Sequence, residues 1–180
     1  MKTFAHNPFV HMAHKSLACL LVFCIVNMPV WALSSGDATV VTGATPNAGA
    51  PANTVSFDIA GEGIIDWSQM NVDIADAINT LEFTGSSGFA VLNRVAQQVN
   101  FNGNLNALGG HVFIVSPQGV IVGPDASITA SAFTASGLNI SNGDFLNGIH
   151  KFEPFEGGVV GSIENYATID AVTNQVNLLV

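Results

Sequence analysis

The sequence contains little positive charge. Of its 180 residues only four are Lys or Arg, against thirteen Asp or Glu. Lys2 and Lys15 lie near the N-terminus, so residues 33–180 carry only Arg94 and Lys151 as cations and have a formal net charge of −11. Proteins bind nucleic acids and anionic membrane surfaces mainly through Lys and Arg. The composition therefore excludes both kinds of partner.

Cysteine is equally scarce, and both copies belong to a predicted leader. Cys19 and Cys24 lie inside the apolar run Ser16–Ala32 (SLACLLVFCIVNMPVWA). The N-terminus starts with basic residues, continues with an apolar run shorter than the ~20 residues of a membrane span, and ends on small residues. This pattern predicts a signal peptide over residues 1–32, cleaved after Ala32, rather than a membrane anchor. After cleavage we expect no stable membrane insertion. No disulfide would then hinder passage of the unfolded chain across a second membrane.

Helical periodicity is rare beyond residue 53. Apolar residues alternate with a period of two, as in VSFDI at 55–59 and HVFIV at 111–115, and turn clusters such as Ser141–Asp144 separate the runs. Short alternating runs bounded by turn residues are typical of β-strands. The one helix-like stretch, Asp73–Thr80, has strand-like flanks, and we interpret it as a loop or a single turn.

Strand length and spacing favour a β-solenoid over a sandwich or an antiparallel barrel. The predicted strands are short, Pro117 and Pro124 lie in turns, and Ile114, Ile121 and Ile128 recur at intervals of seven. Proline interrupts strand ladders, and short strands joined by turns suit stacked coils with an inward apolar column. Each buried Val or Ile would contribute roughly 1.5–3 kcal/mol. The sequence thus predicts an all-β fold of the β-helix type.

The two ends of this region differ. Leu33–Asn53 is rich in small and polar residues and predicts an irregular segment with one strand at Thr39–Thr42. The C-terminal stretch Gly157–Val180 continues the strand pattern and ends on VNLLV without a polar cap. Because solenoids need capped ends, we expect either that the chain is truncated or that further coils are supplied elsewhere.

Four stretches then carry a family resemblance: Gly63–Trp67 (GIIDW), Val91–Val95 (VLNRV), Val112–Gly123 (VFIVSPQGVIVG) and Leu138–Gly148 (LNISNGDFLNG). In order and spacing they resemble the N-terminal secretion domain of two-partner-secretion exoproteins, of the filamentous haemagglutinin type. Any one of them alone would be weak. Together they cover about Val55–Lys151, which is most of the mature chain.

The resemblance implies a right-handed parallel β-helix over residues 54–180, with an N-terminal cap at 33–53 and small extra-helical β elements. It also implies a non-enzymatic role without a cofactor. A signal peptide would export the chain to the periplasm of a Gram-negative bacterium, and a cognate outer-membrane barrel transporter would recognise it. The chain would pass through the barrel, initiate β-helix folding outside and reach the medium or the cell surface. Such domains commonly precede adhesins, haemagglutinins, haemolysins or contact-dependent toxins, so a host or neighbouring-cell surface is a further expected partner.

The resemblance places the secretion motif at two positions. These are Asn93-Arg94 and Ser116-Pro117-Gln118-Gly119-Val120. The second replaces the family's Asn-Pro-Asn-Gly-Ile, keeping Pro and Gly but neither Asn, and a first Asn-Pro element expected between Arg94 and Leu105 has no counterpart. From the residues alone, Pro117 fixes φ and Gly119 permits a positive φ, so the segment is interpreted as a tight turn, with transporter recognition as the second interpretation.

Other polar residues are given structural interpretations. Arg94 is expected to bind carbonyls or a carboxylate inside the cap, and Asn93 and Asn104 are expected to form side-chain bonds along turns. Two sets of oxygen ligands could bind Ca²⁺, but neither matches an EF-hand loop or a nonapeptide repeat. These sets are Asp73 with Asp76, and Asn139 with Asn142 and Asp144. His111 and His150 have no zinc-ligand spacing, and exposed or capping roles are expected for them.

Catalysis is not expected. The sequence has no Gly-x-Ser-x-Gly nucleophile motif, and two cations cannot readily hold an acidic polysaccharide. The alternatives to a secretion domain are a stand-alone β-helix adhesin, a polysaccharide-active β-helix enzyme, and the remnant of a broken gene.

Overall fold

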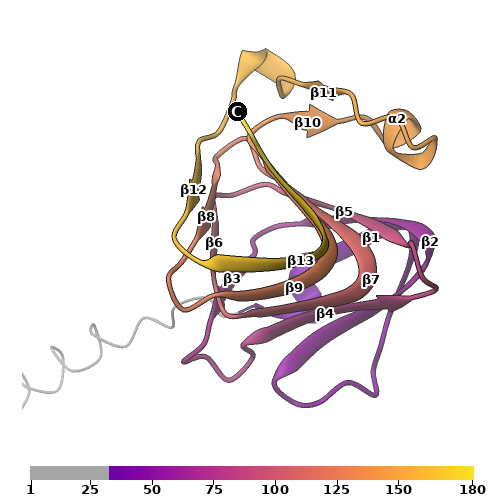
Figure 1. The fold of residues 1–180 in the computed structure, drawn as a ribbon, viewed down its shortest axis with the longest axis vertical. Helices are drawn as coiled ribbons and strands as arrows, with labels where there is room; N and C mark the ends of the chain where they lie inside the picture. Colours follow the sequence, from indigo (N-terminus) through magenta and orange to yellow (C-terminus); the bar gives the residue numbers. More distant parts are fainter. Residues whose placement is uncertain (1–32) are drawn as a thin grey trace, which may run out of the picture. The chain divides into compact units, whose positions relative to one another are not determined.

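Stacked coils of parallel β-strands form the part of the chain that the computed structural model describes, residues 33–180 (Figure 1). Each coil has three sides, and the first two belong to one parallel sheet. In this sheet β2 is followed by β4 and β5, which lie on the same coil, and then by β7, β9 and β13. These strands are β2 (Thr54–Trp67), β4 (Thr80–Gly85), β5 (Ala90–Val95), β7 (Asn104–Val115), β9 (Ser127–Ser136) and β13 (Thr168–Leu179). The predicted parallel β-helix is therefore confirmed.

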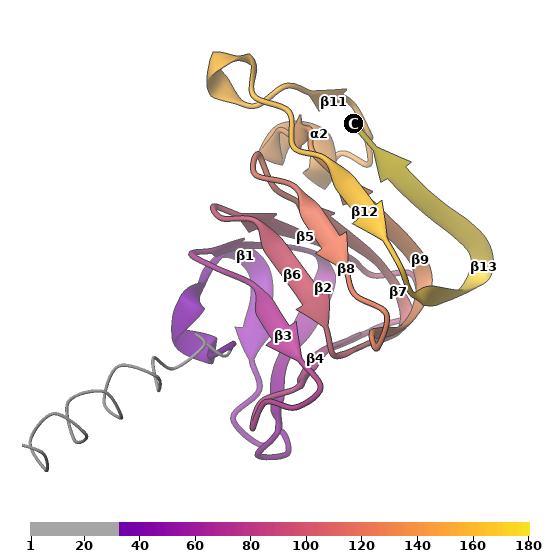
Figure 2. The same cartoon turned by 90° about the vertical axis from the view of Figure 1, so that its left-hand side faces the viewer.

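The third side is a separate parallel sheet, whose strands lie side by side in Figure 2. Its order is β3-β6-β8-β12, so each coil adds one short strand to it. The strands are β3 (Asn71–Asp73), β6 (Val99–Asn102), β8 (Val120–Val122) and β12 (Ile163–Asn165). The stretch Ile74–Asn79 is irregular, as predicted.

Register aligns the inward side chains into columns. Thr54 pairs with Thr80, Thr80 with Asn104, and Asn104 with Ser127, so successive coils are 26, 24 and 23 residues long. One residue further along each strand lies a buried aliphatic column. It consists of Val55, Leu81, Leu105 and Ile128, each at most 5% exposed. A single coil cannot bury such a face alone, so stability is shared between neighbouring coils.

The interval of seven residues separates successive sides of one coil, as the prediction of short strands joined by turns implied. Ile114, Ile121 and Ile128 lie on β7, β8 and β9, which are successive sides rather than successive coils. Ile114 and Ile128 are buried, but Ile121 is only half-buried. Since β8 alternates and buries Val120 and Val122, its middle residue must face outward.

An antiparallel strand covers the first coil. β1 (Ala38–Pro46) pairs with β2 and follows the short helix η2 (Ser35–Asp37), so the strand predicted at Thr39–Thr42 is confirmed and is longer than predicted. Leu33 is fully buried in the core cluster, and the Leu33 N–H donates to the Asn71 carbonyl at 3.1 Å. The core is thereby closed at its N-terminal end.

The predicted leader, residues 1–32, and its cleavage after Ala32 lie outside the described residues. Within residues 33–180, no helix has the length and apolar character needed to cross a membrane.

At the other end, β13 pairs with β9 along one edge. Val176 and Leu178 continue the inward columns of Phe133 and Ala135, yet they are 41% and 43% exposed. Among the described residues no further coil stacks on them, so part of an apolar surface stays open to solvent.

Between β9 and β12 the chain leaves the coils as an extra-helical segment, residues 137–162 (Figure 1). Its elements are β10 (Asn139–Ile140), α2 (Asn142–Leu146), β11 (Phe152–Glu153) and η3 (Glu156–Gly158). The cluster Ser141–Asp144, predicted as a turn, instead starts α2. The Ser141 hydroxyl accepts the Asp144 N–H at 3.0 Å, which is an N-cap that favours helix.

A second apolar cluster joins this segment to the outer face of the second side. Its buried members are Ile64, Leu92, Phe113, Val115, Ile140 and Phe145. Ile140 therefore packs outside the coils and not in the inward column that the alternating pattern suggests. Because both faces of this side are covered, its strands are apolar on consecutive residues rather than alternately.

His111 lies at the border of this cluster. Its ring stacks on Phe113 with centroids 3.9 Å apart, and its Nε2 lies 2.8 Å from Thr134 Oγ1. His150, remote in sequence, reaches within 5.8 Å of the His111 ring. Burial, and then the nearby His150, lower the pKa of His111 to about 4.

This depressed pKa predicts a stability that falls with acidification. An unfolded His titrates near 6.5, so between pH 6.5 and about 4 the unfolded chain takes up the proton first and folding is disfavoured. Thermal midpoints followed by circular dichroism should fall more steeply across this window for the wild type than for His111→Gln. His150→Gln removes one of the two causes of the lowered pKa, so the total loss of stability should be smaller and should be complete at a higher pH than in the wild type. Parallel curves for the wild type and His111→Gln would contradict this assignment.

Candidate functional site

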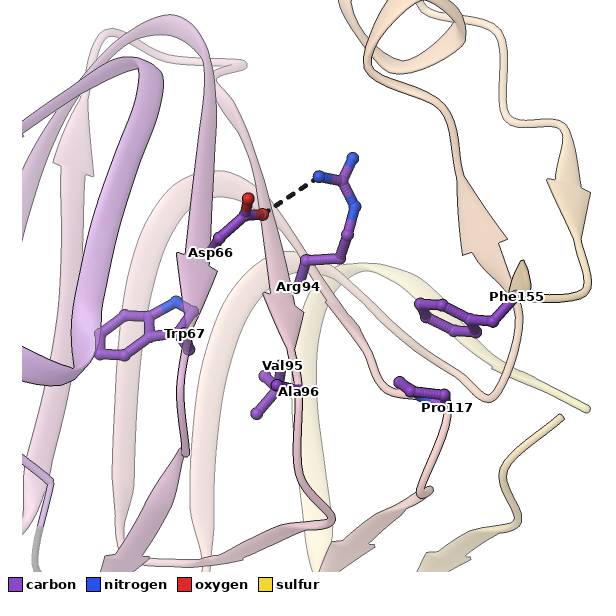
Figure 3. A pocket seen from close by; sticks show the side chains of 7 residues that line it. All are labelled: Asp66, Trp67, Arg94, Val95, Ala96, Pro117 and Phe155. Atoms are coloured by element: carbon purple, nitrogen blue, oxygen red, sulfur yellow. Dashed lines mark hydrogen bonds and ion pairs between the residues drawn. The ribbon is translucent and has the colours of Figure 1, made fainter. Parts of the chain in front are cut away.

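The two predicted secretion motifs meet at one cavity. It has a volume of about 410 Å³ and is called the Arg94 cavity below. Its lining residues are Asp66, Trp67, Arg94, Val95, Ala96, Pro117 and Phe155. In Figure 3 the strand that carries Arg94, Val95 and Ala96 lies on one side, and Pro117 and Phe155 lie on the other. The volume falls within the range of small-ligand pockets, roughly 300–1,000 Å³.

Arg94 connects the coils to the extra-helical segment. Its Nη1 donates to Asp66 Oδ1 at 3.1 Å, and its Nε donates to Asn139 Oδ1 at 3.1 Å. Its Nη2 donates to the Ile140 carbonyl at 3.2 Å and to Asn142 Oδ1. The predicted bonds to a carbonyl and a carboxylate are present, but the carboxylate belongs to Asp66 on β2 and the carbonyl to Ile140 in the extra-helical segment, so Arg94 joins these two parts and does not bind the N-terminal cap. The guanidinium is suited to this because it carries five donors in a fixed plane.

Asn93 points the opposite way from Arg94, as alternation along β5 requires. It is fully buried in the core. The Trp67 Nε1–H donates to Asn93 Oδ1 at 3.0 Å, and Asn93 Nδ2 donates to the Phe113 carbonyl at 3.1 Å. These bonds run between coils and not along a turn, so that prediction was wrong for Asn93. Asn104 likewise reaches toward Thr80 on the preceding coil, at 3.5 Å.

Ser116–Val120 forms the predicted tight turn. The Ser116 hydroxyl donates to the Gln97 carbonyl at 2.8 Å and accepts the Gln118 N–H at 3.1 Å, while the Gly119 N–H donates to the Ser116 carbonyl at 3.2 Å. Asn side chains make the same kind of local bond to the backbone two residues on, which explains how Ser can replace Asn here. Ser116 and Val120 are buried, whereas Pro117 is half-buried and Gln118 is exposed.

The candidate calcium ligands serve other purposes. Asn139 and Asn142 both accept hydrogen bonds from Arg94, and Asp144 accepts one from Ser141. Asp73 Oδ1 accepts the Ala75 N–H at 2.9 Å, and this bond, with a second from Asn102, lowers the Asp73 pKa. Among residues 33–180 no three His, Cys, Asp or Glu side chains are grouped to hold a metal ion.

Sequence reasoning missed Asp66, Ala96 and Phe155 as partners of the predicted motif. Asp66 pairs with Arg94 across neighbouring strands, because it stands opposite Arg94 in the β2–β5 register. Phe155 reaches the cavity only because the extra-helical segment folds back on the coils. Neither relation leaves a short-range signal in the sequence.

The fold and the cavity define a capped parallel β-helix with an extra-helical segment held against one side by Arg94. No family model matches the chain, and no curated protein does. Among solved structures it is similar to the HMW1 secretion domain from Haemophilus influenzae, with a TM-score of 0.69 and 31% sequence identity. The match covers 78% of this chain and 38% of that one, so the chain spans well under half of the relative's length.

Replacement of Asn93 tests the buried polar contact. Asn93→Ala leaves the buried Trp67 N–H without its Asn93 acceptor and removes one hydrogen bond from the Phe113 carbonyl, so the free energy of unfolding should fall by about 1–3 kcal/mol. Urea unfolding followed by circular dichroism measures this. The exposed Asn106 on β7 is a matched control, and Asn106→Ala should change stability by less than about 0.5 kcal/mol. Equal, small effects of the two substitutions would show that the buried bonds contribute nothing.

Gly119 tests the geometry of the turn. Its φ is +99°, and a Cβ there would lie 2.5 Å from the Ser162 carbonyl oxygen. Gly88 has a similar φ of +86° but nothing within 4 Å of its Cβ position. Both alanine variants incur backbone strain, but only Gly119→Ala must also displace the chain at Ser162. Gly119→Ala should therefore be less stable than Gly88→Ala by about 1–3 kcal/mol in urea unfolding, and equal losses would disagree with the described contact.

Proposed function

We propose that this chain is a secretion-targeting and folding-initiation domain of a two-partner-secretion exoprotein. The observation that carries the proposal is the similarity to a bacterial secretion domain, at 31% identity and a TM-score of 0.69. A cognate outer-membrane barrel transporter recognises the chain, which travels through the periplasm to the outside of a Gram-negative cell. The role is non-enzymatic, and the exported product acts as an adhesin-like protein of the filamentous haemagglutinin type.

The two ends of the β-helix support the folding-initiation part of this proposal. β1 covers the first coil, so folding has a closed starting surface. β13 leaves one edge and the partly exposed Val176 and Leu178 available at the other end. Unpaired strand edges and apolar surface favour addition of a further strand, so growth proceeds in one direction only.

The burial of the motif residues supports recognition of a chain that is not fully folded. Asn93, Ser116 and Val120 are each fully buried in the folded domain. A transporter can contact these three only before they enter the core. In the folded domain, Arg94, Pro117 and Gln118 are the motif residues that solvent reaches.

Export in a defined host tests the proposal. The chain with residues 1–32 intact should reach the medium only when its cognate transporter is co-expressed, and should stay in the periplasm otherwise. Immunoblots of medium, periplasm and cytoplasm give the distribution, and a variant lacking residues 1–32 controls for cell lysis. Equal release with and without the transporter would refute the role.

A further inference from the structure

We propose that residues 138–160 of the extra-helical segment open as a unit while the coils stay folded, and that protonation of His111 triggers the opening. The motion uncovers the apolar outer face of the second side and removes Phe155 from the Arg94 cavity. The inference does not depend on the proposed function, because it concerns a motion of the folded domain itself.

The two ends of the segment meet, so the segment can leave without disturbing the coils. The Gly161 N–H donates to the Gly137 carbonyl at 3.2 Å, and a Cβ on Gly137 would lie 1.8 Å from the Gly161 carbonyl oxygen. Between these glycines, β10 and β11 form a two-stranded sheet of their own. The ladders of the coils therefore remain paired when the segment opens, which is the condition for a local opening of low cost.

An aromatic and a polar contact hold the segment against the coils. The aromatic contact joins Phe113 on β7 to three rings of the segment. The polar contact joins Arg94 on β5 to β10 and α2. The three rings belong to Phe145, His150 and Phe152, and their centroids lie 5.4, 5.0 and 6.5 Å from that of Phe113. Both contacts use side chains of the coils, so they can break without loss of strand pairing.

His111 places a titratable group inside the aromatic contact. Its ring stacks on Phe113 and meets the His150 ring at a right angle, with centroids 5.8 Å apart. His150 belongs to the segment, so the segment covers one side of the His111 ring. An imidazole in this position is returned to water when the segment leaves.

The described groups that face His111 do not compensate an added proton. His150 is the titratable group that acts on it, and a protonated His150 repels a second positive charge. The charges that follow His150 in the chain, Lys151 and Glu153, pair with each other at 2.6 Å. From the coils, the neighbours of His111 in register are two uncharged residues, Ala90 on β5 and Ala132 on β9.

A polar relay from the last coil favours the neutral ring as well. The Asn177 amide on β13 donates to the Thr134 hydroxyl at 3.1 Å, and that hydroxyl lies 2.8 Å from His111 Nε2. All three groups are satisfied when the hydroxyl accepts from Asn177 and donates to an unprotonated Nε2. A proton on Nε2 places two donors against each other and breaks this relay.

Linkage gives the size of the effect. In the closed form, burial and His150 lower the pKa of His111 to about 4, whereas a solvated His titrates near 6.5. At pH 7 the ring is neutral in both forms and the segment stays closed. As the pH falls from 6.5 toward 4, the proton binds the open form preferentially. Between pH 7 and pH 5 the ratio of open to closed molecules should rise by about twentyfold.

Hydrogen exchange of the full-length chain, followed by mass spectrometry, tests the opening. An isolated helix as short as α2 is unstable in water, so opening exposes its amides. After correction for the intrinsic effect of pH on exchange, protection of residues 142–148 should fall by about twentyfold from pH 7 to pH 5. Peptides from β5 and β7 should keep their protection. Equal loss in both regions, or no loss in the segment, overturns the local opening.

Four variants test the assignment to His111. His111→Gln should reduce the pH response of residues 142–148 to less than about twofold, because residue 111 no longer titrates. His150→Gln should give an intermediate response, since it removes one of the two causes of the lowered pKa. Arg94→Gln should lower protection at both pH values and leave their ratio unchanged, because it removes a contact that does not titrate in this range. His14→Gln, in the predicted leader, is the matched control and should behave as the wild type does.

A wild-type response in His111→Gln would overturn the role of His111. Circular dichroism at pH 7 checks that each variant is folded. If His111→Gln is unfolded, His150→Gln carries the test, because His150 is exposed and its replacement leaves the coils intact. A full twentyfold response in His150→Gln would then count against the proposal.

Discussion

The register between successive coils is the constraint on which the rest of this structure depends. Each parallel pairing places one residue of a coil directly over its counterpart, so Val55, Leu81, Leu105 and Ile128 form one buried column. A one-residue shift would turn every inward side chain outward. The same register places Asp66 opposite Arg94 on one face and brings Asn93 to Trp67 in the core.

Arg94 and Asn93 are adjacent on β5, but their side chains lie on opposite faces of the strand and have different structural roles. Asn93 satisfies an indole N–H inside the coils, and Arg94 holds the extra-helical segment outside them. A motif that combines the two residues therefore couples the core to the outer segment. This coupling contributes to the cavity, because Phe155 belongs to the extra-helical segment and lies on the same side of the cavity as Pro117 (Figure 3).

Much of the fold could be predicted from the sequence, because period-two alternation and turn residues are local signals. The strand near Thr39–Thr42, the loop at Asp73–Thr80 and the turn at Ser116–Val120 all follow from such signals. The spacing of seven at Ile114, Ile121 and Ile128 reflects successive sides of one coil, although Ile121 on β8 is only half-buried. The start of α2 at Ser141–Asp144 was missed, because a Ser and Asp cluster serves a turn or a helix N-cap equally well.

By itself the sequence determined the β-helix class, the acidic surface and the positions of the turns, since each depends on neighbouring residues or on composition. Only the tertiary structure decided which residues meet. His111 contacts His150, Asn139 and Asn142 accept hydrogen bonds from Arg94, and Phe155 completes a cavity with Pro117. These contacts join residues far apart along the chain, and their geometry is set by coil length and by the path of the extra-helical segment, which local sequence patterns do not record.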